Sequence, residues 1–286
     1  MSESPPAMTD APRLSVVLPV YDVDPTYLRD AMRSVLLQTY RDFELIVVED
    51  RAARSAAKLV EEMADPRVHY YENPHRNGLG AALNFGMAKA RALLIARMDA
   101  DDLCEPNRFA IQIAAFDADP KLDLLGSQIS VIDSGGAPIG FRVYPLGHRD
   151  ILRALRRYNC ISHPSVVFRR AKVRDVGGYG ERIVHEDYDL WCRLALAGAR
   201  IENRPERLIR YRFHSESTKL SDIRASLIET IQIKQRYFSA ELDPLDRTRI
   251  LGEWALTLIP AAWVVRLFGA IEYHHPFFGR AERSRS

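Results

Sequence analysis

The sequence predicts an α/β fold, in which a mostly parallel sheet is flanked by helices on both faces. Apolar runs of strand length alternate with segments of helical periodicity, which is the element order of a parallel sheet with crossover helices. Acidic residues follow several of these runs, at the strand ends where open parallel sheets bind ligands. With 47% apolar and 27% charged residues among 286, the composition is that of an ordinary globular protein.

The first half of the chain carries the regular alternation. The run 14–20 is the first expected strand, and Pro25 suits the first turn of a helix whose apolar residues recur at helical spacing. The next expected elements are a strand at 43–48, a helix at 52–63, a strand at 68–71, a helix at 79–91 and a strand at 92–96. The carboxyl ends of the first, second and fourth strands should therefore meet at one crevice.

The second half of the chain is less regular. The sequence Asp-Ser-Gly-Gly at 133–136 is a strong turn signal, so two strands are expected within 122–144. The later expected elements are helices at 148–158 and 187–197, the second ended by Gly198, then one or two strands within 200–212 and mainly helix from about 220. These features predict a disordered tail at 1–13, a main domain at 14–218 and a C-terminal helical extension at 219–286.

An apolar segment at 254–271 allows three interpretations. A membrane-spanning helix needs about twenty apolar residues with few charges, and this segment is short and interrupted by Pro260 and Arg266. Packing against the main domain or a partner is favoured, and contact with a membrane surface is the other alternative. The basic residues Arg280, Arg283 and Arg285 favour an anionic surface.

Charge and cysteine usage exclude several classes of protein. Forty basic against 38 acidic residues leave a net charge of +2, so no nucleic-acid partner is expected. Three widely spaced cysteines form neither a C-x-x-C pair nor a disulfide framework, which fits a reducing, cytoplasmic compartment. The first 13 residues lack the basic start and apolar core of a secretory signal.

The most informative motif is Arg-Met-Asp-Ala-Asp-Asp at 97–102, which follows the strand at 92–96. Alternate residues of an extended segment point to one side, so Asp99 and Asp101 can reach one divalent cation. Asp102 is expected to point elsewhere or to cap the next helix. The alternative is that all three are turn and cap residues.

A second acidic motif is Glu186-Asp187 at the start of the helix expected at 187–197. Acidic residues are common at helix N-termini because of the helix dipole, which is the structural alternative. Asp187 is the candidate for a general base that takes a proton from a hydroxyl group. Glu186 would raise the proton affinity of Asp187 or bind the acceptor.

The order and spacing of several motifs resemble those of family 2 glycosyltransferases, which have the GT-A fold. The matching motifs run from residue 14 to about residue 217, and they are S-V-V-L-P-V-Y, V-V-E-D, N-G-L-G-A-A-L-N-F-G, R-M-D-A-D-D, H-P-S-V-V-F-R-R, G-G-Y, H-E-D-Y-D-L-W-C-R-L and Y-R-F-H-S-E-S. The family's usual D-D-G-S is replaced here by E-D-R-A at 49–52. This replacement leaves recognition of the base open.

The resemblance implies a role for particular residues. Pro19, Val20 and Tyr21 would line the nucleotide pocket, and Asp50 or, as the weaker candidate, Glu49 would bind the base. The other implied roles are ribose, sugar or metal contact for Asp99, metal binding for Asp101, approach to the metal or diphosphate for His214, and the base for Asp187.

Two arginines are further candidates for the donor site. Arg76 precedes Gly78, and Arg97 adjoins the aspartates, so either can bind phosphate or pair with a carboxylate. For both residues a structural ion pair is an equal alternative. His163 is expected only to order the acceptor loop.

The resemblance implies an inverting enzyme that uses Mn²⁺ or Mg²⁺ and transfers a sugar from a nucleotide-diphosphate sugar, expected to be a UDP-sugar. The chain lacks the Q-x-x-R-W motif and the several membrane spans of polymerising members, so addition of one sugar to a glycan or lipid-linked acceptor is expected. Such a reaction would serve polysaccharide or lipopolysaccharide-type synthesis at the inner face of the membrane. A catalytically impaired nucleotide-sugar-binding or scaffolding protein is the alternative, and a homodimer is left open.

Overall fold

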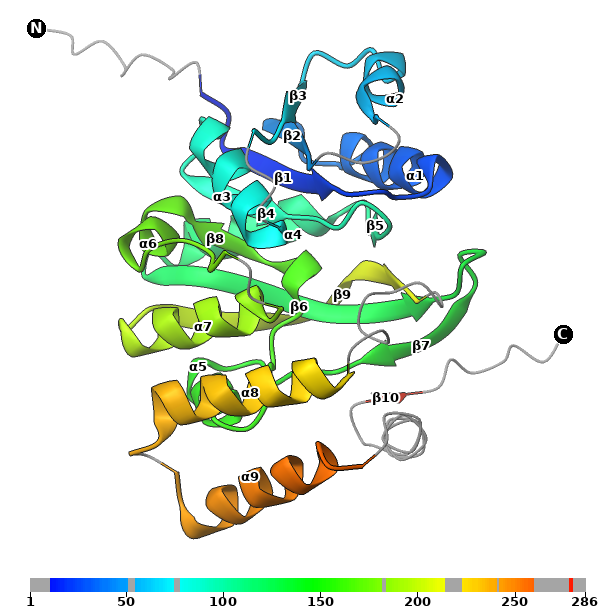
Figure 1. The fold of residues 1–286 in the computed structure, drawn as a ribbon. Coiled ribbons are helices and arrows are strands. Elements are labelled where there is room, and N and C mark those ends of the chain that lie inside the picture. Colours follow the sequence, from blue (N-terminus) through cyan, green and yellow to red (C-terminus); the bar gives the residue numbers. More distant parts are fainter. Residues whose placement is uncertain are drawn as a thin grey trace, which may run out of the picture.

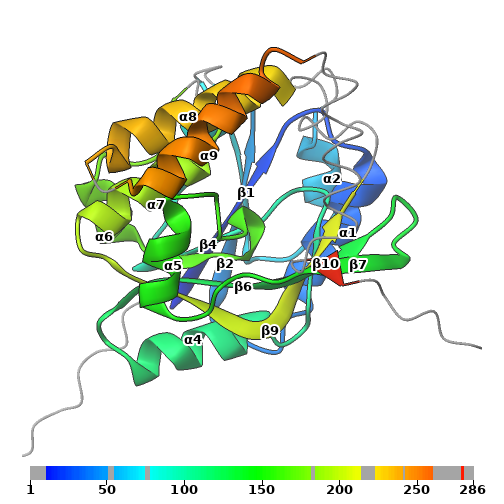
Figure 2. The ribbon, with the colours of Figure 1, turned by 90° about the horizontal axis from the view of Figure 1, so that it is seen from below.

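The computed structural model describes residues 11–50, 55–74, 78–181, 184–213, 223–240, 242–259 and 278–279. One curled sheet runs through these residues, with helices on both of its faces (Figures 1 and 2). The expected α/β class is therefore confirmed. Within 1–13, residues 1–10 lie outside the described part of the chain, and Arg13 pairs with Asp117.

The first half of the sheet is parallel. Its strands are β1 (Leu14–Val20), β2 (Phe43–Glu49), β3 (Val68–Glu72) and β4 (Leu94–Arg97), in the spatial order β3-β2-β1-β4. Both faces of β1 are buried, since Val16 and Leu18 join one core cluster whereas Val17 joins the other. Strands buried on both faces are typical of parallel sheets, and they explain the continuous apolar runs.

The second half of the sheet is mixed. Its strands are β5 (Leu103–Cys104), β6 (Leu122–Ile132), β7 (Pro138–Arg142), β8 (Val167–Arg169), β9 (Arg200–Arg212) and β10 (Phe278–Gly279). The three-residue strand β8 lies antiparallel between β4 and β6, and the long strand β9 runs parallel to β6. The turn at 133–136 joins β6 and β7 as expected, and its Gly136 has a φ of 88°.

Helices cover the two faces unequally. On one face lie α1 (Pro25–Leu36), α2 (Ala57–Glu62) and α4 (Arg108–Ala118). On the other lie α3 (Leu79–Lys89), α5 (His148–Leu155), α6 (Arg170–Asp175) and α7 (Glu186–Leu196). Helices α8 (Ile223–Phe238) and α9 (Pro244–Leu256) continue outward from α7 (Figure 1).

The helix ends follow their local sequence. The side chain of Asp24 accepts from the backbone N–H of Thr26 at 2.7 Å, and Pro25 follows as the first helical residue of α1. Gly198 adopts a φ of 76° after α7, and the N–H of Ala199 returns to the carbonyl of Leu194 at 3.0 Å. Both expected ends are confirmed.

Some expectations from sequence differ from the structure. Within 52–63 only α2 is helical among the described residues, and 51–54 lie outside them. The 3-10 turn η1 (His163–Ser165) and β8 were not expected, and α4 is the helix expected after the aspartates without stated bounds. Of the apolar segment 254–271, residues 260–271 lie outside the described part, and no helix in the described part is long and apolar enough to cross a bilayer.

Close packing of α3 on the sheet depends on Gly86. A β-carbon at this position would lie 2.5 Å from Cγ1 of Val17 and 3.0 Å from Cγ2 of Val48. The helix can approach β1 and β2 this closely because residue 86 has no side chain.

We predict that Gly86→Ala lowers the free energy of unfolding by about 1–3 kcal/mol, because the added methyl group overpacks the core. Gly252→Ala in α9 is the matched control, since a β-carbon there meets nothing within 4 Å. That control should raise the free energy of unfolding by about 0.5–1 kcal/mol. Urea denaturation measures both, and equal effects of the two substitutions would contradict the packing argument.

Candidate active site

The parallel strands bring the candidate residues to one edge of the sheet. Strands β1, β2 and β4 run side by side in the same direction, so Val20, Glu49 and Arg97 all lie at carboxyl ends. The N–H of Asp50 donates to the carbonyl of Val20 at 2.9 Å, which closes the end of β2 onto β1.

A cluster of three carboxylates follows β4. Asp99, Asp101 and Asp102 each offer an oxygen within 4.8 Å of the others. The prediction that Asp102 points elsewhere or caps the next helix is wrong, because Asn107 is the residue that precedes α4. Asp102 joins the cluster because the buried N–H of Arg212 donates to its Oδ1 at 2.8 Å.

The cluster fits a divalent cation. Asp102 is fully buried, and its Oδ2 has no hydrogen-bond partner within the described part of the chain. Burial and the neighbouring Asp99 and Asp101 raise the pKa of Asp102 well above its usual value. A bound cation would satisfy this oxygen and offset the repulsion among the carboxylates.

Arg212 at the end of β9 holds the aspartate loop, and the sequence analysis did not single it out. Its Nε donates to the carbonyl of Asp101 at 2.8 Å and its Nη1 to the carbonyl of Ser134 at 2.9 Å. Its guanidinium also stacks on Tyr27, 4.3 Å from the ring centroid. Strand β9 thus reaches the cluster just before His214, which itself lies outside the described residues.

Two buried arginines order the start of the same loop. The Arg97 side chain is 3% exposed and is paired with the carboxylate of Asp99. Arg108 from α4 donates to the carbonyl of Arg97 at 2.9 Å and to that of Val166 at 3.3 Å. For Arg97, burial lowers the pKa, but the charge and hydrogen bond of Asp99 together with Tyr179 and Glu186 outweigh it, so the net pKa is raised.

The second acidic motif, Glu186-Asp187, lies in the first turn of α7 and faces the region of the aspartate cluster. Asp187 is half-buried; its Oδ2 accepts from Nδ2 of Asn159 and its Oδ1 from the N–H of Tyr188, both at 2.7 Å. Burial raises the pKa of Glu186 to about 8, with contributions from Asp187 and Asp99, whereas Arg97 opposes them. The structure therefore brings together the two acidic motifs, which lie far apart in the sequence.

His163 also belongs to this region, although the sequence suggested only a loop-ordering role. Its Nδ1 lies 3.5 Å from Oε1 of Glu186, and its Nε2 lies 3.1 Å from the hydroxyl of Tyr179. The motif H-P-S was visible in the sequence, but nothing in it indicated that η1 packs against the start of α7.

On the nucleotide side, Glu49 and Asp50 have different environments. The Glu49 carboxylate accepts from the N–H of Ala56 and from the hydroxyl of Ser55, both at 3.1 Å, and also from the Tyr70 hydroxyl. It is therefore engaged in holding the start of α2. The Asp50 carboxylate accepts one longer bond, from Nδ2 of Asn73 at 3.3 Å.

The other expected donor residues are partly described. Tyr21 is 73% exposed beyond the end of β1, whereas Val20 is buried in the core and Pro19 is half-buried. Arg76 lies outside the described residues.

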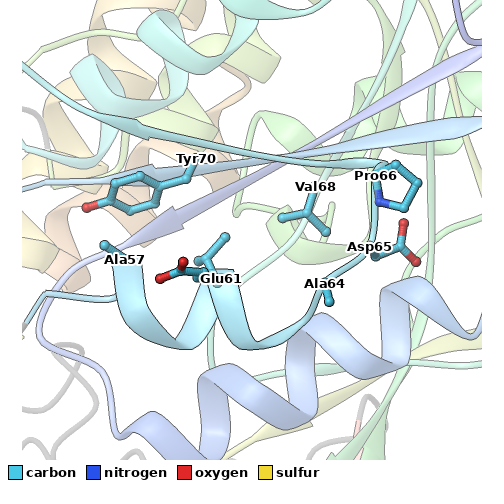
Figure 3. A pocket seen from close by; sticks show the side chains of 8 residues that line it. Ala57, Glu61, Ala64, Asp65, Pro66, Val68 and Tyr70 are labelled. Carbon is cyan, nitrogen blue, oxygen red and sulfur yellow. The ribbon is translucent and has the colours of Figure 1, made fainter.

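A pocket lies between α2 and the edge strand β3 (Figure 3), next to Glu49, which its lining residue Tyr70 contacts. Its walls include Glu61, Asp65 and Tyr70. None of the expected site residues lines it.

Comparison with known proteins gives consistent matches. The family described as Glycosyl transferase family 2 matches residues 15–176. The chain is 33% identical over 205 residues to the amylovoran biosynthesis glycosyltransferase AmsE of Erwinia amylovora, covering 71% of this chain and 77% of that one. It is 28% identical over 213 residues to the UDP-Gal:alpha-D-GlcNAc-diphosphoundecaprenol beta-1,3-galactosyltransferase of Escherichia coli, covering 73% and 78%.

A solved structure shows the same fold. The mannosyltransferase PcManGT from Pyrobaculum calidifontis, in complex with GDP-Man and Mn²⁺, superimposes with a TM-score of 0.62 at 17% identity. The match covers 93% of this chain and 75% of that one. The two chains share the GT-A fold.

The burial of Glu186 generates a prediction about stability. In the folded protein its pKa is about 8, above the ordinary value of 4.5, so between these two pH values the folded state holds a proton that the unfolded state has lost. The contribution of Glu186 to the free energy of unfolding is therefore fully present below about pH 4.5, and it is lost as the pH rises through about 8.

Glu186→Gln should remove this part of the pH dependence and stabilise the protein at pH 8 by on the order of 4 kcal/mol. Urea denaturation from pH 5 to pH 9 measures it. Glu61→Gln, at an exposed position in α2, is the control and should leave the pH dependence unchanged. A Glu186→Gln curve parallel to that of the wild type would show that Glu186 is ionised in the folded protein.

Proposed function

The chain belongs to glycosyl transferase family 2, and from this premise we propose that it is an inverting, metal-dependent enzyme that adds a single sugar. The donor would be a nucleotide-diphosphate sugar. The observation that supports this best is the convergence of two acidic groups, Asp99 to Asp102 after β4 and Glu186 to Asp187 at α7, on either side of Arg97.

Asp187 is the proposed general base. Two N–H groups donate to its carboxylate at 2.7 Å and fix its orientation, and its partial exposure leaves it accessible to an acceptor. The base would take the proton of the acceptor hydroxyl as that oxygen attacks the anomeric carbon. The bond to the diphosphate breaks on the opposite face, so the configuration inverts and the proton remains on Asp187.

The proposed metal residues are Asp101 and Asp99, joined by Asp102, with His214 retained as a candidate. A bound Mn²⁺ or Mg²⁺ would neutralise charge that develops on the departing diphosphate. The protein's own part is to hold the three carboxylates together, which Arg212 and Arg108 do by binding the backbone on both sides of the cluster.

The donor is proposed to be a UDP-sugar. Asp50 is the better candidate for contact with the base, because Glu49 is already engaged with α2. Pro19, Val20 and Tyr21 would line the nucleotide pocket through the end of β1. Arg76 and Arg97 remain candidates for the diphosphate, although Arg97 is paired with Asp99 in this structure.

The acceptor is proposed to be a glycan or a lipid-linked glycan of cell-surface polysaccharide synthesis. The names of the two relatives, one in amylovoran biosynthesis and one acting on a diphosphoundecaprenol-linked sugar, support this. A location at the cytoplasmic face of the membrane would suit such an acceptor. Leu251 in α9 and Leu258 just after it have exposed side chains that suit a membrane surface, and a second copy of the chain is the competing occupant.

We predict that Asp187→Asn lowers kcat by about a hundredfold or more, the usual scale for loss of a general base. Donor affinity should change little, because the substitution keeps the size of the side chain. The measurement is nucleoside diphosphate release, with a donor first selected by thermal shift. Asp175→Asn, at an exposed position at the end of α6, should retain wild-type turnover.

Near-normal turnover of Asp187→Asn would remove Asp187 from the role of base. Wild-type protein that binds a donor tightly but turns over with no acceptor tried would instead support the scaffolding alternative.

We further predict that Asp101→Ala abolishes manganese-dependent donor binding, because the cluster loses a carboxylate that carries negative charge to the cation. Isothermal titration with the selected donor, with and without Mn²⁺, measures this. Asp175→Ala serves as the control. Unchanged Mn²⁺ affinity in Asp101→Ala would contradict the metal assignment.

A further inference from the structure

A buried polar chain lies behind the start of α7. It runs from Oε1 of Glu186 to Nδ1 of His163 at 3.5 Å, and from Nε2 of His163 to the hydroxyl of Tyr179 at 3.1 Å. All three residues are buried, although they come from α7, from η1 and from the loop after α6. A buried polar chain of this kind destabilises the fold unless each of its polar groups has a hydrogen-bond partner.

Packing fixes the His163 ring in this chain. The ring lies 5.4 Å from the Tyr179 ring and edge-on to Trp191 at 5.8 Å, measured between centroids. Tyr179 is itself held, because Nδ2 of Asn84 donates to its carbonyl and its N–H donates to Oδ1 of Asn84, both at 2.9 Å. Asn84 therefore ties α3 to the Tyr179 loop.

The two neighbouring carboxyl groups at α7 have opposite environments. Asp187 is half-exposed and accepts two hydrogen bonds at 2.7 Å. Glu186 is buried, which favours its neutral form, and its Oε1 lies 3.5 Å from Nδ1 of His163. Ionising both would place two negative charges on consecutive residues in a partly dry site, so one proton should stay on this pair.

We propose that His163 is a positioning residue of the acceptor side, whose Nδ1 accepts the proton of the Glu186 carboxyl group while its Nε2–H donates to the Tyr179 hydroxyl, so that Glu186 is the neutral neighbour of Asp187. The acceptor side in this statement rests on the proposed function. The arrangement of His163, Glu186 and Tyr179 does not depend on it.

The charged groups around Glu186 act on its protonation, and most of them favour the neutral carboxyl group. Asp187 on α7 and Asp99 after β4 both favour its neutral form, whereas Arg97 opposes them and is already paired with Asp99. Tyr179 closes the far end of the chain, and burial raises the pKa of its hydroxyl, so the hydroxyl is uncharged at neutral pH. The raised pKa of Glu186 supports the same assignment.

The test is a carbon and nitrogen NMR titration of the full chain, labelled at glutamate carboxyl carbons and histidine ring nitrogens, without donor or acceptor. The signal lost in Glu186→Gln identifies Glu186. At pH 7 its carboxyl carbon should be in the protonated form and titrate near pH 8, with the His163 hydrogen on Nε2. An ionised Glu186, an imidazolium, or a hydrogen on Nδ1 would overturn the proposal.

Two substitutions at position 163 test the contact between Nδ1 of His163 and the Glu186 carboxyl group. His163→Leu keeps the apolar bulk but removes the acceptor, so the Glu186 pKa should fall by about one unit. His163→Asn keeps an oxygen near the former Nδ1 position and should restore most of that shift. An unchanged Glu186 pKa in a folded His163→Leu protein would overturn the proposal.

Turnover provides a separate readout. In His163→Leu the alkaline limb of kcat should move to lower pH while the donor KM stays constant, and His163→Asn should reverse the movement. An alkaline limb that stays in place in an active His163→Leu enzyme would also overturn the proposal. A protein that passes the NMR test but turns over with no donor would refute the proposed function and leave the His163 assignment standing.

Discussion

The buried guanidinium of Arg97 is the interaction on which the rest of the site depends. A cation removed from water is costly unless it is paired, and Arg97 is paired with Asp99 while its field reaches Glu186. Its backbone is fixed on both sides, because its N–H donates to the carbonyl of Val166 and its own carbonyl accepts from Arg108. One charge therefore links the loop that follows β4 to the first turn of α7, and the antiparallel segment at Val166 keeps that link in place.

The two groups of acidic residues near Arg97 differ in their environments. The aspartates at 99, 101 and 102 are crowded, and Asp102 keeps a buried oxygen without a partner in the described chain, so the group gains stability when positive charge is added. At α7 the neighbouring carboxyls are instead divided by environment, because Asp187 receives N–H donors and Glu186 faces His163.

The fold and the acidic motifs could be predicted from sequence because both depend on local patterns. Buried runs such as Leu14 to Val20 identify strands. Because the carboxyl ends of parallel strands lie at the same edge of a sheet, Asp50 and Asp99 are expected together at that edge. Asp102, Arg212 and His163 could not be assigned in this way. Asp102 is oriented by a residue 110 positions later in the chain, and His163 acquires its role from packing of η1 against α7. Strand β8 was missed because three residues are too short to show a period.

The parallel and mixed halves of the sheet meet where β4 pairs with β8, and this boundary has a consequence for how the acceptor side could vary. On the parallel side lie the strand ends proposed to hold the nucleotide, and on the mixed side lie α5, η1 and α7, which would meet the acceptor. On the proposed function, replacements in α5 or around η1 would change the acceptor side, whereas β9 and α7 carry Arg212 and Asp187 and would have to be kept.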